Sequence, residues 1–170
     1  IGATAAQEGM RVLLLGFDPR RAGVGQFVGL SGPATSLADL TEGRLTLADA
    51  VRAVPDYEGF DVIVFDRRTP LTARLIAAFR DGPLAGMKAA YDMVIIDTPP
   101  ALGVSDAARL GMLADAALIV VRAGRTPESA LQHCIDHLQN SGVRLAGTVV
   151  NDMEPRRFRK MNLGGNDAYY

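Results

Sequence analysis

Five short apolar runs constrain the fold of this chain more than any other feature of its sequence. They span residues 11–16, 60–65, 91–96, 116–121 and 145–150. Strict alternation between apolar and polar positions is missing from them, which is typical of strands that are covered on both faces. The segments between them carry helix signals, so strands and helices alternate along the chain. This pattern predicts an α/β fold with an open, mainly parallel sheet and helices on both faces.

The sequence indicates where two of the helices begin and end. One is predicted from Thr126, as N-cap, to Asn140, with Gly142 as its C-terminal stop. A shorter amphipathic helix is predicted to follow Thr46 and to end at Pro55. Apolar residues at helical spacing predict the buried stripe of the longer helix, namely Ala130, Leu131, Cys134, Ile135 and Leu138.

Composition narrows the class of protein. The 170 residues suit one domain, and 48% of them are hydrophobic, which supports a sizeable core. With 18 Lys and Arg against 19 Asp and Glu, the net charge of -1 argues against a nucleic-acid partner. Cys134 is the single cysteine, which excludes an internal disulfide and a multi-cysteine zinc site. No apolar run approaches the roughly 18 residues of a membrane span, so we expect a cytoplasmic location.

Polar residues directly after the predicted strands are the candidates for chemistry, because ligands of open parallel sheets bind at the carboxyl ends of the strands. Asp18 and Asp97 both occupy such positions. A carboxylate there can hold Mg²⁺, and the hydroxyl of Thr98 can order its water. Asp66 also follows an apolar run, but it lacks the Pro99–Pro100 pair that fixes an extended exit after Asp97. Asp97 is therefore the stronger candidate.

Four segments resemble the bacterial tyrosine kinases, which form the cytoplasmic part of exopolysaccharide and capsule chain-length regulators. Residues 12–21 (VLLLGFDPRR) resemble that family's second nucleotide motif, an apolar strand followed by Asp-x-Asp-x-Arg. Residues 94–100 (VIIDTPP) resemble its Walker B strand. Residues 115–126 (DAALIVVRAGRT) and 147–152 (GTVVND) are similar to the strands that follow. The family belongs with the deviant P-loop ATPases that position septa and partition chromosomes.

The resemblance implies a three-layer, P-loop NTPase-like fold that uses ATP and Mg²⁺. It implies that Asp97 holds the hydrated Mg²⁺ and that Asp18 activates a tyrosine hydroxyl. The resemblance also implies that three residues bind the nucleotide, namely Asn151, Thr98 and Arg125. The two terminal tyrosines, Tyr169 and Tyr170, are the implied phosphoacceptors.

The resemblance also implies an organisation. Residues 1–152 would form the kinase domain without its first strand and Walker A loop, and residues 153–170 a basic, flexible tail. The implied partners are further copies in a ring, with each tail entering a neighbour's site, and a membrane-embedded regulator region, fused or separate. That arrangement places the domain at the inner face of the cell membrane.

Two departures from the family pattern concern the phosphate and metal sites. The sequence contains no Gly-x-x-x-x-Gly-Lys-Ser/Thr, whose backbone and lysine hold phosphates. Residues 1–9 resemble the back of the helix that follows such a loop, so we expect the loop on a preceding segment or a partner. Gly16 stands where the first aspartate of Asp-x-Asp would be. A non-catalytic regulatory domain is therefore the alternative to a kinase, and a partitioning-type ATPase is less favoured because of the terminal tyrosines.

Overall fold

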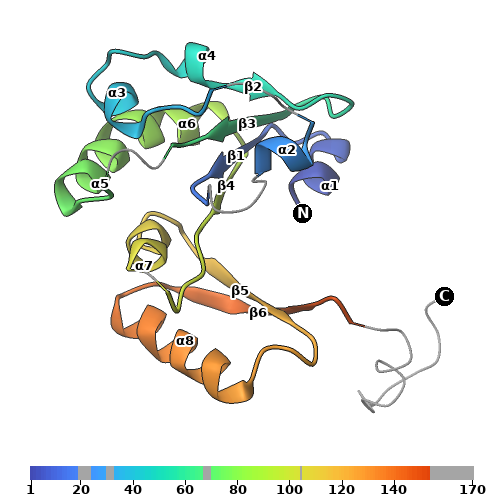
Figure 1. Cartoon of the computed structure of the whole chain (residues 1–170). Helices are drawn as coiled ribbons and strands as arrows, with labels where there is room; N and C mark the ends of the chain where they lie inside the picture. The colour runs from blue at the N-terminus through green and yellow to red at the C-terminus, as the bar shows by residue number, and fades with distance from the viewer. Residues whose placement is uncertain (19–23, 30–32, 67–69, 104, 154–170) are drawn as a thin grey trace. The chain divides into compact units, whose positions relative to one another are not determined.

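The strands expected from the five apolar runs are all present in the structure (Figure 1), a computed structural model that describes residues 1–18, 24–29, 33–66, 70–103 and 105–153. They are β1 (Val12–Gly16), β3 (Phe60–Val64), β4 (Met93–Asp97), β5 (Ala117–Arg122) and β6 (Leu145–Asn151). A two-residue strand, β2 (Arg52–Ala53), was not expected from the sequence. The helices are α1 (Gly2–Gln7), α2 (Val24–Phe27), α3 (Leu37–Thr41), α4 (Leu47–Ala50), α5 (Ala73–Phe79), the π-helix η1 (Arg80–Leu84), α6 (Ala85–Ala90), α7 (Asp106–Gly111) and α8 (Glu128–Asn140).

The chain divides into two compact units, residues 1–115 and 116–170. The first unit contains a sheet of order β2-β3-β1-β4, in which β1 pairs in parallel with both β3 and β4. The short β2 pairs antiparallel with β3. Gly16, at the end of β1, lies opposite Val64 on one side and Asp97 on the other. The carboxyl ends of β3, β1 and β4 therefore meet at one edge of the sheet.

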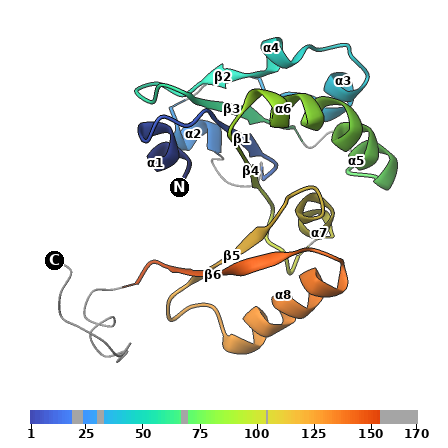
Figure 2. The ribbon, with the colours of Figure 1, turned by 180° about the vertical axis from the view of Figure 1, so that it is seen from behind.

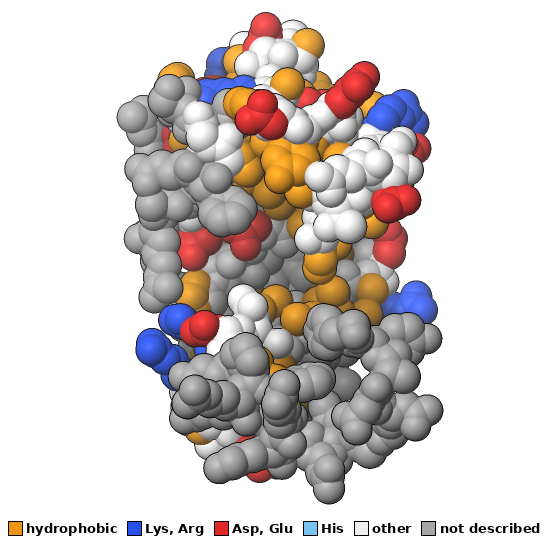
Figure 3. All heavy atoms as spheres, turned by 90° about the vertical axis from the view of Figure 1, so that its right-hand side faces the viewer, with side chains coloured by type: hydrophobic (Ala, Val, Ile, Leu, Met, Phe, Trp, Pro, Cys, Tyr) orange, Lys and Arg blue, Asp and Glu red, His pale blue; other side chains and the backbone are white. Residues whose placement is uncertain are grey.

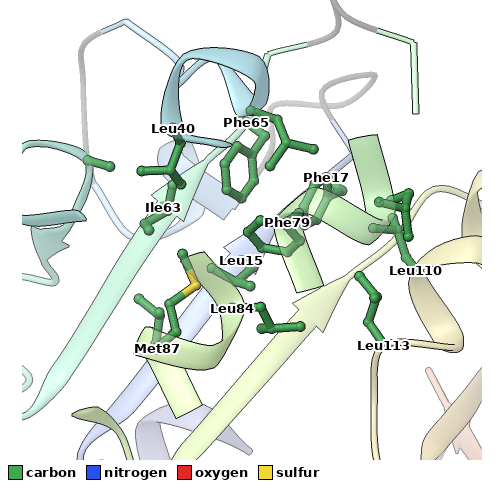
Figure 4. Packing of buried hydrophobic residues seen from close by; sticks show 14 residues of the cluster. Leu15, Phe17, Leu40, Ile63, Phe65, Phe79, Leu84, Met87, Leu110 and Leu113 are labelled. Atoms are coloured by element: carbon green, nitrogen blue, oxygen red, sulfur yellow. The ribbon is translucent and has the colours of Figure 1, made fainter. Parts of the chain in front are cut away.

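Helices cover both faces of this sheet, as the apolar strands predicted (Figures 1 and 2). Alternate residues of β1 point to opposite faces, Val12 towards α1 and α2, and Leu13 towards α3, α5 and α6. The larger cluster is the main core (Figure 4) and includes Leu15, Leu37, Leu40, Ile63, Ile76, Leu84, Met87 and Leu110. This two-sided burial is why these strands lack alternation in the sequence.

An aromatic cluster in the main core anchors the carboxyl edge of the sheet. The ring of Phe17 stacks on that of Phe65 with centroids 4.4 Å apart. Phe79, from α5, meets both rings edge to face at 6.1 and 6.0 Å. Because Phe17 directly precedes Asp18, its burial fixes where the chain leaves β1.

The second unit consists of the parallel pair β5–β6 and helix α8. Cys134 and Leu138 of α8 are buried, as predicted, while the other three residues of the predicted stripe are half-buried. Gly142 follows the helix with φ of +82°, a left-handed conformation that favours glycine. The predicted stop is therefore confirmed.

Two predicted helix boundaries were wrong. Thr126 does not cap α8, because its hydroxyl instead accepts a hydrogen bond from the backbone N–H of Arg122 at 3.1 Å, and Pro127 takes the N-cap position. Thr46 does cap α4, in a reciprocal capping box with Asp49, but the helix ends at Ala50. The residues after it pair with β3 instead, so sheet pairing shortens this helix.

None of the helices in the described part of the chain is long and apolar enough to span a bilayer.

Candidate active site

Asp18 and Asp97 come together at the carboxyl edge of the first unit's sheet. Asp97 is the last residue of β4, and its carbonyl oxygen accepts a hydrogen bond from the backbone N–H of Phe17 at 2.9 Å. That bond continues the β1–β4 pairing beyond Gly16 and brings the next residue, Asp18, beside Asp97. The two candidates are thus neighbours across adjacent parallel strands. The sequence predicted that each follows a strand, but not that the two strands are adjacent.

The electrostatics of Asp97 reflect this position. Desolvation by the surrounding chain, followed by repulsion from the carboxylate of Asp18, raises the pKa of the Asp97 carboxyl above its ordinary value. The residue nevertheless keeps an exposed surface, so its carboxylate is accessible from solvent. Two repelling carboxylates, at least one of them accessible, suit a divalent cation, because a cation relieves the repulsion and carboxylate oxygens are preferred ligands of Mg²⁺. Asp18 and Asp97 therefore fit the implied metal.

Gly16 lies between the strands that carry these two aspartates. A Cβ placed on Gly16 would contact the Cβ of Val24 at 3.4 Å and its Cγ2 at 3.5 Å, which are ordinary packing distances. Its φ lies outside the left-handed range, so backbone conformation does not require glycine here. The absence of a carboxylate at this position is a property of the sequence and not a requirement of the fold.

Asp66 lies at the same edge, after β3. Its backbone N–H donates to the carbonyl oxygen of Thr35 at 2.9 Å, and Thr35 forms a parallel bridge with Phe65. Thr35 is 8% exposed and is the buried polar residue of the described core. The sequence pattern favoured Asp97 over Asp66, and it did not indicate that Thr35 extends the sheet beside Asp66.

The second unit carries Arg125 and Asn151 at the carboxyl end of β5 and β6. The backbone N–H of Ala123 donates to the carbonyl oxygen of Asn151 at 2.8 Å, which leaves the exposed side chain of Asn151 outside the strand pairing. Arg122 contributes an ion pair to Asp152 with an N–O distance of 2.6 Å. This exposed ion pair links the ends of β5 and β6, beside Arg125 and Asn151, and the sequence did not reveal it.

The remaining predicted residues divide into two groups. Thr98, half-buried, directly follows Asp97 and precedes the buried Pro99. Tyr169 and Tyr170 lie outside the described residues. Among the residues that are described, no group of three or more His, Cys, Asp or Glu side chains could hold a metal ion. Any Mg²⁺ would therefore have to take much of its coordination from water and phosphate, as Mg²⁺ commonly does.

Comparisons with known proteins identify relatives that match most or all of this chain. The tyrosine-protein kinase Wzc of Salmonella typhimurium is 28% identical over 171 residues, covering 100% of this chain and 23% of Wzc. The tyrosine-protein kinase YwqD of Bacillus subtilis is 32% identical over 147 residues, covering 86% of this chain and 61% of YwqD. The kinase domain of the Escherichia coli tyrosine kinase ETK superposes with a TM-score of 0.79 at 27% identity, covering 99% of this chain and 63% of that domain. The chain belongs to the bacterial tyrosine kinase family.

The topology of the first unit agrees with the bacterial tyrosine kinase fold, because the strands β1 and β4, which carry the two nucleotide motifs, lie side by side. The cell division protein MinD of Aquifex aeolicus shares the fold, with a TM-score of 0.70 at 21% identity. No protein-family model matches the chain. Since the chain spans less than two thirds of these kinases, their activity is a proposal for this chain.

Proposed function

We propose that this chain is part of a protein-tyrosine autokinase domain that transfers the γ-phosphoryl group of Mg-ATP to Tyr169 and Tyr170. The observation that carries the proposal is the Asp18–Asp97 pair at the carboxyl edge of the sheet. In a family of tyrosine kinases, this is the edge at which nucleotide chemistry is expected.

The two carboxylates have different proposed tasks. Asp97, at the end of β4, holds the hydrated Mg²⁺, and Thr98 orders its water. Asp18 accepts the proton of the attacking tyrosine hydroxyl. The nucleotide contacts are assigned to Asn151, for the purine, and to Arg125. The Mg²⁺ would neutralise the charge that develops on the phosphoryl group.

The C-terminal tail is long enough to deliver the acceptor tyrosines to a neighbouring molecule. Tyr170 lies 18 residues beyond Asp152. An extended chain spans about 3.3 to 3.6 Å per residue, so the tail can reach roughly 60 Å. We propose that copies of the domain assemble in a ring at the inner face of the membrane, beside a chain-length regulator, and that tail phosphorylation controls polysaccharide polymerisation and export.

The test is calorimetry of Mg²⁺-dependent ATP binding, on this chain and on a longer form with an added upstream P-loop segment. Phosphorylation of Tyr169 and Tyr170 is followed by mass spectrometry, and Asp97→Asn serves as the matched control. We expect binding and modification in a form that provides the phosphate loop, with loss of both in the control. Absence of binding in both forms would overturn the kinase function.

Gly16 favours a second candidate, a regulatory domain that keeps the fold without catalysis. One metal-site carboxylate of the family pattern is missing at this position, although the structure has room for a Cβ there. Gly16→Asp distinguishes the two candidates. If the site is a weakened kinase site, restoring the carboxylate raises Mg-ATP affinity in calorimetry, whereas a regulatory domain shows no change. Gly16→Ala controls for the added Cβ.

A further inference from the structure

The two tyrosines that the structure describes differ in the bonding of their hydroxyl groups. Tyr91 is half-buried, and its hydroxyl donates to Oδ2 of Asp61 at 2.8 Å. Tyr57 is 36% exposed. Within the described residues, its hydroxyl makes no hydrogen bond, and the one aromatic ring that its own ring meets is that of Phe60, edge to face at 6.2 Å. Tyr169 and Tyr170 belong to the tail.

Two consecutive turns hold Tyr57 between β2 and β3. Its backbone N–H donates to the carbonyl oxygen of Val54 at 3.3 Å, and its own carbonyl oxygen accepts from the N–H of Phe60 at 3.2 Å. Asp56 has φ of +65° and Gly59 has φ of +74°, the left-handed conformations that tight turns require at such positions. Both backbone groups of Tyr57 are therefore used in turns, and its side chain stays outside the sheet.

The surroundings of Tyr57 are acidic and hollowed. Asp56 and Glu58, on either side of it, are both exposed. The ring lines a hollow of about 500 Å³ whose other walls are mainly apolar, formed by Ala3, Val28, Gly29, Val54, Pro55 and Phe60. This turn lies on the right-hand side of Figure 1, and Figure 3 shows that the upper part of that face exposes hydrophobic side chains bordered by acidic ones.

We propose that Tyr57 is a further phosphoacceptor of this chain, in addition to Tyr169 and Tyr170, and that it is modified in trans by the tyrosine kinase site of another molecule. The inference rests on the proposed function, because it takes the donor to be a kinase of this family. The phenolic oxygen of Tyr57 forms a bond to the γ-phosphorus of ATP, and the bond from that phosphorus to the β–γ bridging oxygen breaks. ADP leaves with the bonding electron pair, and the phenolic proton passes to a carboxylate base of the donor and then to solvent.

The sheet topology makes the transfer intermolecular. Tyr57 precedes Phe60, which lies opposite Val12 where the parallel strands begin. Asp18 and Asp97 lie at the other end of those strands. A five-residue strand at about 3.3 Å per residue separates the two edges by roughly 15 Å. The carboxylates of one molecule consequently cannot serve its own Tyr57.

Phosphorylation of Tyr57 would add negative charge at the rim of the hollow. A phosphotyrosine carries about two negative charges at neutral pH, and here it would stand beside Asp56 and Glu58 at the rim of an apolar surface. Any apolar group bound in the hollow would then face three acidic neighbours. Phosphorylation of Tyr57 therefore disfavours apolar contacts at this face.

The test incubates the folded chain with Mg-ATP and the active kinase domain of Escherichia coli ETK, followed by trypsin digestion and mass spectrometry. The tryptic peptide covering residues 53–67 contains Tyr57 as its single hydroxyl residue, so its phosphorylation needs no further localisation. We expect this peptide to gain about 80 Da, the mass of one phosphoryl group. The signal disappears in Tyr57→Phe and persists in Asp97→Asn, whose own site is not the donor.

Tyr91 provides the internal control, because its bonded and half-buried hydroxyl stays unmodified while the chain is folded. Phosphate on the terminal tyrosines without phosphate on Tyr57 would overturn this proposal and leave the proposed function standing. A donor that modifies itself but leaves Tyr57 unmodified would overturn it as well. The proposed function fails on a different observation, the absence of Mg-ATP binding by the chain and its longer form.

Discussion

At the scale of single residues, the fold holds two carboxylates that repel each other, those of Asp18 and Asp97, side by side at one edge of the sheet. Asp97 ends β4 within a continuous backbone pairing, so it cannot move away from Asp18 without breaking that pairing. Its raised pKa records desolvation first and repulsion from Asp18 second, and both disfavour the charged form. A cation bound at this edge of the sheet, as the proposed function requires, would relieve the repulsion between the two carboxylates.

Replacing Asp18 with Asn should lower the pKa of the Asp97 carboxyl towards its ordinary value. Desolvation, the larger cause of the shift, remains, so the pKa should not return to that value completely. The measurement is a carbon-13 NMR titration of Asp97 in the absence of metal. Asp115→Asn, which removes an exposed carboxylate paired with Lys88, is the control and should leave Asp97 unchanged. An identical Asp97 titration in the Asp18 variant would contradict the pairing of the two aspartates.

Tyr91 gives a second prediction at this scale. Burial, and then the hydrogen bond to Asp61, raise the pKa of Tyr91 from 10.0 to about 12. The folded chain therefore keeps this proton when the unfolded chain loses it, so the stabilisation is complete below pH 10 and is lost as pH rises through about 12. Tyr91→Phe should cost about 1 kcal/mol at neutral pH and abolish this alkaline loss.

Urea unfolding at neutral and alkaline pH measures both effects, and absorbance of tyrosinate follows the titration itself. Tyr57→Phe is the matched control, because its hydroxyl has no hydrogen-bond partner in the described part of the molecule. Equal stability of the Tyr91 variant and the unmodified chain would show that the bond to Asp61 contributes nothing.

At the scale of elements, the sequence predicted the strands that hydrophobic patterning indicates. It did not predict the pairings and contacts that depend on segments far apart in the chain. The five strands were predicted because burial on both faces leaves continuous apolar runs. The positions of Asp18 and Asp97 at the carboxyl edge were predicted because each follows an apolar run, whereas the adjacency of their strands was not. Strand β2 was missed because two residues carry no period, and its pairing with β3 depends on a segment further along the chain. The contact between Tyr91 and Asp61, 30 residues apart, likewise has no local signal.

A substitution in helix α5 measures how much the aromatic cluster contributes to the stability of the first unit. Phe79 is 0% exposed and meets the rings of both Phe17 and Phe65. Phe79→Ala should lower the free energy of unfolding by about 3 to 5 kcal/mol, through lost burial and the cavity left behind. Met112→Ala, at a site 53% exposed, should change it by less than about 0.5 kcal/mol. Urea unfolding with amide exchange across β1 and β3 is the measurement, and a similar small change for both variants would contradict the assigned core.

At the scale of the whole molecule, charge balance makes the chain sensitive to phosphorylation. Its net charge is only -1, and two phosphotyrosines at the terminus would take it to about -5 at neutral pH. The added charge falls within the tail, close to residues 154–160, which contain one acid and four bases. If unphosphorylated tails enter neighbouring acidic sites, phosphorylation places negative charge against Asp18 and Asp97 and weakens the assembly.

Light scattering coupled to size-exclusion chromatography tests this prediction on a phosphorylation-competent form of the protein. The unphosphorylated form should elute as an oligomer, and the form phosphorylated at Tyr169 and Tyr170 as smaller species. Raising salt from low to physiological ionic strength should reduce the difference, because exposed charges are screened beyond about 8 Å. The double variant Tyr169→Phe, Tyr170→Phe should remain assembled under phosphorylating conditions. Equal molar masses for the two forms at low salt would mean that tail charge does not control assembly, and any regulation by phosphorylation would then have to act through another tyrosine.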